Sequence, residues 1–142
     1  MNSDNSVTID ARYRVLVILW FGIIMSVLMF LVVIVVVPTQ VNKNPTLTLL
    51  LNGLGLVPVA ASFLLKQVLL AQSAKQQRSD LVQTAYILSF ALCEVAALLG
   101  LMDHFLTGSR YFYLGFMIAG FGLLLNFPRK RHLEDAESYP KI

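Results

Sequence analysis

The stretch Ala85-Tyr-Ile-Leu-Ser-Phe-Ala-Leu-Cys-Glu-Val-Ala-Ala-Leu-Leu-Gly-Leu-Met102 decides how this chain folds. It is long and apolar enough to cross a bilayer as one helix, yet it carries one acid, Glu94, near its middle. A carboxylate at that depth costs roughly 2.5–3.5 kcal/mol on insertion scales. We therefore expect the chain either to use Glu94 chemically or to hide it in a contact between helices.

Three further apolar segments accompany this stretch, so that the four cover residues 15–37, 47–70, 81–102 and 111–127. Only 13% of the 142 residues are charged and 57% are hydrophobic, whereas a soluble domain carries about 25% charged residues. Inside lipid, backbone hydrogen bonds must close within the segment, which favours helices. The sequence predicts an all-α fold, an integral membrane four-helix bundle built of two helical hairpins.

The segments between the apolar runs predict the domain organisation and the orientation. We expect a cytoplasmic N-terminal segment over residues 1–14, a transmembrane domain over 15–127 and a solvated cytoplasmic tail over 128–142. Basic side chains on the side of the two termini outnumber those on the other side, Lys43 and Arg110, by nine to two. The nine are Arg12, Arg14, Lys66, Lys75, Arg78, Arg129, Lys130, Arg131 and Lys141. The positive-inside rule therefore predicts a multi-pass protein with both termini in the cytoplasm.

Local residues mark where the predicted helices begin and end. Ser79 or Asp80 is a candidate cap for the third helix, because short oxygen-bearing side chains accept from free helix N–H groups. The run Thr107-Gly-Ser-Arg110 is typical of a tight turn. Pro128 is expected to close the last helix, which places Arg129, Lys130 and Arg131 at the level of anionic lipid headgroups.

The sequence leaves two interpretations of the role of Glu94 open. Small residues beside it on the same helical face let another helix approach closely, and burial favours the neutral form of a carboxyl. Pro58 lies at a similar depth in the second helix and frees the carbonyl of Leu54, a candidate partner for a protonated Glu94. Glu94 is therefore either an interhelical latch or an ion-binding site.

The remaining polar residues favour no enzymatic chemistry. Asp103 and His104 resemble an acid/base pair, but they fall at the outer end of the third helix and are expected to be interfacial polar residues. The lone Cys93 cannot form an internal disulfide or a multi-cysteine metal site. Nothing resembles a nucleophile elbow, a P-loop or a metal cluster. We expect no catalytic residue, no metal, no cofactor and no nucleic-acid partner.

The stretch around Glu94 resembles the carboxylate-bearing helix of the rotary ATP synthase c subunit. The chain is also similar to a group of bacterial four-helix membrane proteins described as c-subunit-like, on the runs Ala91-Leu-Cys-Glu-Val-Ala-Ala-Leu-Leu-Gly100, Phe105-Leu-Thr-Gly108 and Phe127-Pro-Arg-Lys130. This resemblance implies that the protein lies in the bacterial inner membrane and that Glu94 matches an ion-binding carboxylate. The first apolar segment departs from the c subunit, since it is bulky and contains one glycine, Gly22, instead of many.

Three classes of function remain after these exclusions. The first is an accessory or structural subunit that packs against other membrane subunits or against copies of itself, surrounded by membrane lipids. The second is a proton- or sodium-carrying protein that uses Glu94. The third is a small transporter or a lipid- or quinone-binding protein.

Overall fold

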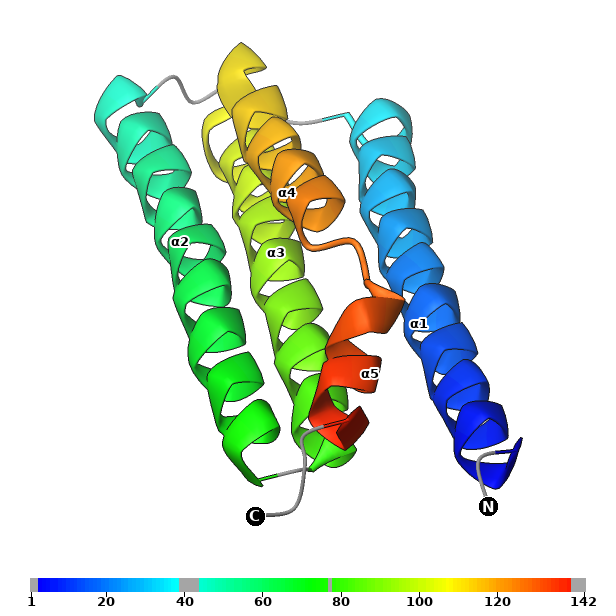
Figure 1. Ribbon diagram of the computed structural model, residues 1–142. Coiled ribbons are helices and arrows are strands. Elements are labelled where there is room, and N and C mark those ends of the chain that lie inside the picture. Colours follow the sequence, from blue (N-terminus) through cyan, green and yellow to red (C-terminus); the bar gives the residue numbers. More distant parts are fainter. Residues whose placement is uncertain (1–2, 39–43, 77, 139–142) are drawn as a thin grey trace.

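The computed structural model describes residues 3–38, 44–76 and 78–138, and these residues are mostly helical, with no strand among them (Figure 1). The elements in chain order are α1 (Ser3–Val36), α2 (Pro45–Gln76), α3 (Ser79–Thr107), the 3-10 helix η1 (Arg110–Phe112), α4 (Tyr113–Leu125) and α5 (Lys130–Ser138). The all-α prediction is confirmed. The chain runs up α1, down α2, up α3 and back down through α4 and α5, so α1 begins and α5 ends at the same end of the molecule (Figure 1). The basic residues Lys43 and Lys141 lie outside the described residues.

The first three helices, α1, α2 and α3, are each long and apolar enough to cross a membrane. The predicted fourth helix, over residues 111–127, is not one continuous α-helix in the structure. It is divided into η1 and α4, and α4 ends at Leu125, three residues before Pro128, as its cap at Asn126 shows. The segment of η1 and α4 is bent by 50° relative to α5, which follows it after a short break. The two segments are long enough for a fourth span only if they are counted together as one bent helix.

The predicted solvated tail is wrong for residues 130–138, which form α5. Leu133 and Ala136 are fully buried, and because they are three positions apart they share one face of the helix. That face lies against α1, α2 and α3, while Arg131, Glu134 and Asp135 on the remaining surface are exposed. A short helix that looks polar in sequence therefore packs against the three long helices at the end of the molecule where α1 begins.

The core lies where α3 meets α2 and α4, and small residues make these contacts. A Cβ placed on Gly55 of α2 would lie 3.9 Å from the Cβ of Ala96. The approach of α4 to α3 is closer still, because a Cβ on Gly115 would lie 2.7 Å from the Cα of Gly100. At the turn between these helices Gly108 has φ 57°, a left-handed conformation that glycine adopts without strain, and its N–H donates to the carbonyl of His104. The predicted tight turn is confirmed.

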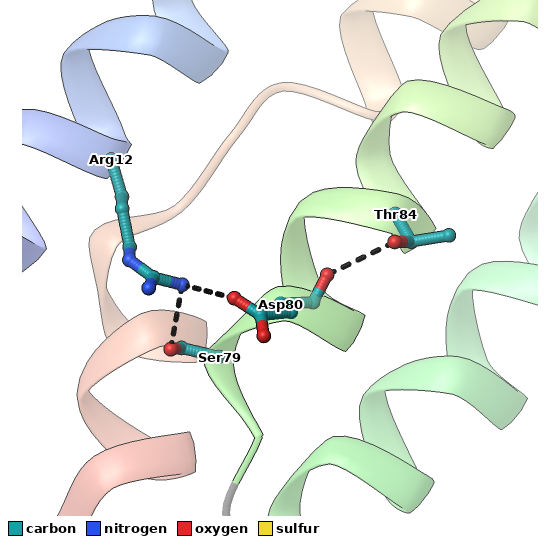
Figure 2. Close-up of polar contacts among 4 residues, drawn as sticks. All are labelled: Arg12, Ser79, Asp80 and Thr84. Atoms are coloured by element: carbon teal, nitrogen blue, oxygen red, sulfur yellow. Dashed lines mark hydrogen bonds and ion pairs between the residues drawn. The ribbon is translucent and has the colours of Figure 1, made fainter.

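The helix α1 is joined to the other helices by polar side chains at several levels. Near its start, Arg12 donates to Ser79 Oγ and Asp80 Oδ1, both at 2.8 Å (Figure 2). These two residues were the predicted caps of α3, but the N-cap is Arg78 and makes no side-chain cap hydrogen bond. The expected caps therefore bind α1 across the helix interface instead.

Trp20 makes the next connection, from α1 to the C-terminal end of α4. Its Nε1–H donates to the carbonyl of Leu123 at 2.9 Å, and its ring meets Phe127 edge-on with centroids 5.0 Å apart. A helix that ends leaves its last carbonyls without intrahelical donors. The indole of α1 supplies one such donor at the break between α4 and α5.

Candidate functional site

Glu94 lies in the interface between α3 and α1, at the level of Ser26. The hydroxyl of Ser26 donates to Glu94 Oε1 at 2.5 Å, and both side chains are partly buried. The acid is therefore neither fully exposed nor fully enclosed. The prediction that Glu94 makes a contact between helices agrees with this hydrogen bond, which joins residues 68 positions apart in the sequence.

The structure gives Glu94 a different partner from the one expected. Pro58 does lie inside α2, but the face of α3 that meets α2 is the one carrying Ala96, which lies against Gly55. Glu94 is two positions from Ala96, which is about 200° around a helix. The acid consequently points away from α2 and towards α1, and the carbonyl of Leu54 is replaced as partner by the hydroxyl of Ser26.

Cys93, next to Glu94, belongs to a separate buried cluster that faces α2 and α4. The amide of Asn126 donates to Ser62 Oγ at 3.2 Å and to Cys93 Sγ at 3.7 Å. Ser62 in turn donates to the carbonyl of Val59 at 2.7 Å. All of these side chains are buried. The cluster holds the break after α4 against the middle of the bundle. The sequence did not point to Asn126, because its partners Ser62 and Cys93 are distant from it along the chain.

Asp103 and His104 are not brought together as an acid/base pair. Asp103 is fully buried and faces α2, where its Oδ2 accepts from Asn52 Nδ2 at 3.1 Å. Its Oδ1 lies 2.9 Å from Thr107 Oγ1, and Thr107 also accepts from Thr48 Oγ1 at 3.1 Å. Asp103 is therefore part of a hydrogen-bonded network between α2 and α3 and not a solvated surface group.

The ring of His104 points to the other side of α3. It meets Phe105 and Phe112 edge-on, with centroids 5.6 and 4.9 Å away. Within the described part of the chain, both of its ring nitrogens are buried without a hydrogen-bond partner. An imidazole in this position packs as an aromatic ring against these phenylalanines.

The predicted headgroup residues follow the break between α4 and α5. Arg129, Lys130 and Arg131 are all exposed, and Lys130 forms an ion pair with Asp10 of α1 at 2.5 Å. The backbone N–H of Arg129 donates to the hydroxyl of Tyr86 at 3.1 Å. The three cations are thus carried by a fixed corner of the fold instead of a free tail.

A second polar group lies directly inside this corner. The Tyr86 hydroxyl also lies 2.6 Å from His132 Nδ1, and Lys66 Nζ lies 4.5 Å from the centroid of the Tyr86 ring. Tyr86 itself is fully buried. Sequence reasoning placed His132 in a solvated tail and so could not find this contact.

The polar residues described above form distinct small groups. Among the residues that the structure describes, no group of three or more His, Cys, Asp or Glu side chains could hold a metal ion. Glu94 has one hydroxyl partner from another helix. Comparison with protein-family models, curated proteins and solved structures finds no match to this chain.

Proposed function

We propose that this protein is a four-helix, non-enzymatic protein of the bacterial inner membrane that serves as an accessory or structural subunit, in a larger membrane complex or in a homo-oligomer. The observation that carries the proposal is the incomplete packing of α1. In its most apolar 18-residue window only 11% of the residues are buried, against 44% in α3. A long helix with so little burial in its own chain is suited to contacts with other helices.

The contact of Glu94 supports a structural role for the acid. Its hydrogen bond with Ser26 holds α1 against α3. Proton relays in membranes use chains of ionisable groups, whereas the contact described for Glu94 is with the hydroxyl of Ser26. The neighbouring residues Cys93 and Ala96 face α2 and α4 and not Glu94. In this proposal Glu94 is a latch that fixes the angle at which α1 is presented.

Native electrophoresis of the protein extracted in a mild detergent tests this proposal. A photoreactive residue placed at Met29, which is 60% exposed on α1, should cross-link to another chain, and the protein should migrate well above its 15.8 kDa monomer. The same residue placed at exposed Leu64 of α2 serves as the comparison. Migration as a monomer, with no cross-link from α1, would contradict the subunit proposal.

The orientation in the membrane is tested separately. We infer that the end carrying Arg12, Lys75 and Arg129 is cytoplasmic, because basic residues are retained there. A cysteine at exposed Asn44 should react with an impermeant thiol reagent added outside the cell, and one at exposed Gln76 should react only after the membrane is opened. The opposite pattern would reverse the orientation.

A second candidate function is the carriage of protons or sodium ions by Glu94. The specific observation that favours it is the hydroxyl of Ser26 beside a partly buried carboxyl, since oxygen donors of this kind suit a hard cation or a transferable proton. A hydrophobic carbodiimide should then label Glu94 in a pH-dependent manner, with protection by sodium if sodium is the ion. Absence of labelling would count against this candidate.

A further inference from the structure

A large pocket is lined by residues from the start of α2 and from the turn between α3 and α4. These segments lie at the end of the bundle opposite the one where α1 begins and α5 ends (Figure 1). Its volume is about 900 Å³, within the range of roughly 300–1,000 Å³ that small-molecule sites occupy. The start of α2 forms one side, and the turn after α3 with η1 and the start of α4 forms the other. No contact described for Glu94 extends to this pocket.

The floor of the pocket is a fixed polar layer. Thr48, Asn52 and Thr107 line it, and they are the same residues that hydrogen-bond to each other and to the buried Asp103. Asn52 Nδ2 donates both to Asp103 and to the carbonyl of Thr48, so its two amide hydrogens are already engaged. The network gives the pocket a defined shape before any ligand enters.

Arg110 lies at the mouth of the pocket. Among the described residues that line the pocket it is the only charged side chain, and no described acid lies within ion-pair distance of it. Ser109, beside it, accepts the N–H of Tyr111 with its Oγ, which leaves its hydroxyl hydrogen to donate. A guanidinium fork with a neighbouring hydroxyl is suited to the oxygens of a phosphate.

The walls of the pocket are apolar and continue onto the outer surface of the helices. Leu49 and Leu114 line the pocket, and they are 77% and 38% exposed. A ligand whose charged group meets Arg110 would therefore lay an apolar chain along these leucines. The cation and the leucines occur together at the ends of the apolar helices. In a membrane, this is the level at which lipid headgroups and acyl chains meet.

We propose that this pocket binds an anionic phospholipid, with the headgroup phosphate at Arg110 and Ser109 and an acyl chain along Leu49 and Leu114. The proposal rests on the membrane placement proposed above but does not depend on whether Glu94 is a latch or an ion carrier. It assigns the outer end of the molecule a lipid site that is independent of the basic corner at Arg129, Lys130 and Arg131.

Photo-labelling with a phosphatidylglycerol analogue tests the pocket. The full chain in mild detergent receives a trace of analogue with its reactive group near the glycerol backbone, and labelled peptides are mapped by mass spectrometry. Labels are expected on residues 44–52 and 107–114. Arg110→Gln should lower them about tenfold or more, because hydrogen bonds to charged groups contribute about 1.5–3 kcal/mol. Label on residues 128–138 should not change.

Two further variants and two ligands sharpen the result. Arg78→Gln, which removes an exposed cation at the other end, should leave the label on the pocket unchanged, whereas Leu49→Trp should reduce it by filling the wall. Full labelling in Arg110→Gln or in Leu49→Trp, or equal labelling by a phosphatidylcholine analogue, would overturn the proposal. Competition by free glycerol phosphate would also overturn it, by making the ligand a soluble phosphate.

An apolar photo-probe separates this proposal from the membrane placement. It should label exposed residues of α1 such as Val35 in protein reconstituted in lipid, whatever occurs at Arg110. In the unmodified protein, absence of phospholipid label on the pocket with α1 still labelled by the apolar probe would contradict the lipid site alone, and absence of both labels would contradict the membrane placement.

Discussion

The helices α1 and α3 are both long and apolar, but they are held in the molecule in different ways. In their most apolar windows 11% of α1 and 44% of α3 is buried. The buried face of α3 includes the small residues Ala96, Ala97 and Gly100, which let α2 and α4 approach closely. The surface of α1 is mostly bulky, and its one glycine, Gly22, has nothing within 4 Å of where a Cβ would be.

This difference shows that hydropathy alone does not identify the core of such a chain. In lipid, apolar surface gains little by meeting other apolar surface, so helices associate through close packing of small residues and through polar contacts. The helix α3 uses small residues, whereas α1 is fixed by Arg12, Trp20 and Ser26. Glu94 belongs to the second kind of contact.

The largest effect is expected where α3 and α4 cross. Gly115→Ala would place a Cβ 2.7 Å from the Cα of Gly100, and the neighbours are backbone atoms that cannot rotate away. We expect a loss of about 1–3 kcal/mol or more in unfolding free energy, measured by denaturant titration in detergent. Gly120→Ala is the matched control, since nothing lies within 4 Å of its Cβ position, and a similar loss there would contradict the account of the α3–α4 contact.

A comparable or somewhat smaller loss is expected in the network between α2 and α3. Asn52→Ala removes the amide that donates to Asp103 Oδ2. An oxygen of a fully buried carboxyl group then loses this hydrogen bond. The expected cost is about 1–3 kcal/mol, read in the same titration. Gln72→Ala on the exposed face of α2 should be nearly neutral, and equal losses in the two variants would show that the network contributes nothing specific.

The latch between α1 and α3 is expected to contribute less. Glu94→Leu removes the acceptor of the Ser26 hydroxyl and should weaken helix packing by about 1–2 kcal/mol, the range for hydrogen bonds between membrane helices. Adding Ser26→Ala to Glu94→Leu should cost little more, because the bond is already lost. Full additivity of the two changes would mean that the two side chains do not interact.

The smallest effect is expected at the exposed end of α1. Arg12 pairs with Asp80 at 2.8 Å, but their side chains are 34% and 66% exposed, so water and salt screen the pair. Arg12→Gln should cost about 0.2–1 kcal/mol, and the cost should shrink as salt is added. A larger loss that salt does not reduce would show that Arg12 contributes to α1 packing in another way.

Sequence reasoning predicted the helical fold and the turn at Gly108 because both depend on local residue properties. It expected the partner of Glu94 to be the Leu54 carbonyl of α2, whereas the partner is Ser26 of α1, because the choice depends on how α3 is rotated about its axis. The burial of Leu133 and Ala136 also escaped it, because a nine-residue segment with many charges gives little apolar signal. Asn126 and Asp103 were missed as network members because their partners are 33 to 64 positions away.

Glu94→Gln, followed in parallel by complex size and by ion flux in liposomes, tests the central claim most directly. The amide oxygen of glutamine can still accept from the Ser26 hydroxyl, but an amide cannot exchange a proton. If Glu94 is a latch in a structural subunit, the variant should keep the oligomeric size of the unmodified protein, and neither protein should conduct ions. Flux in the unmodified protein that the variant abolishes, with assembly intact, would contradict this account and make Glu94 an ion carrier.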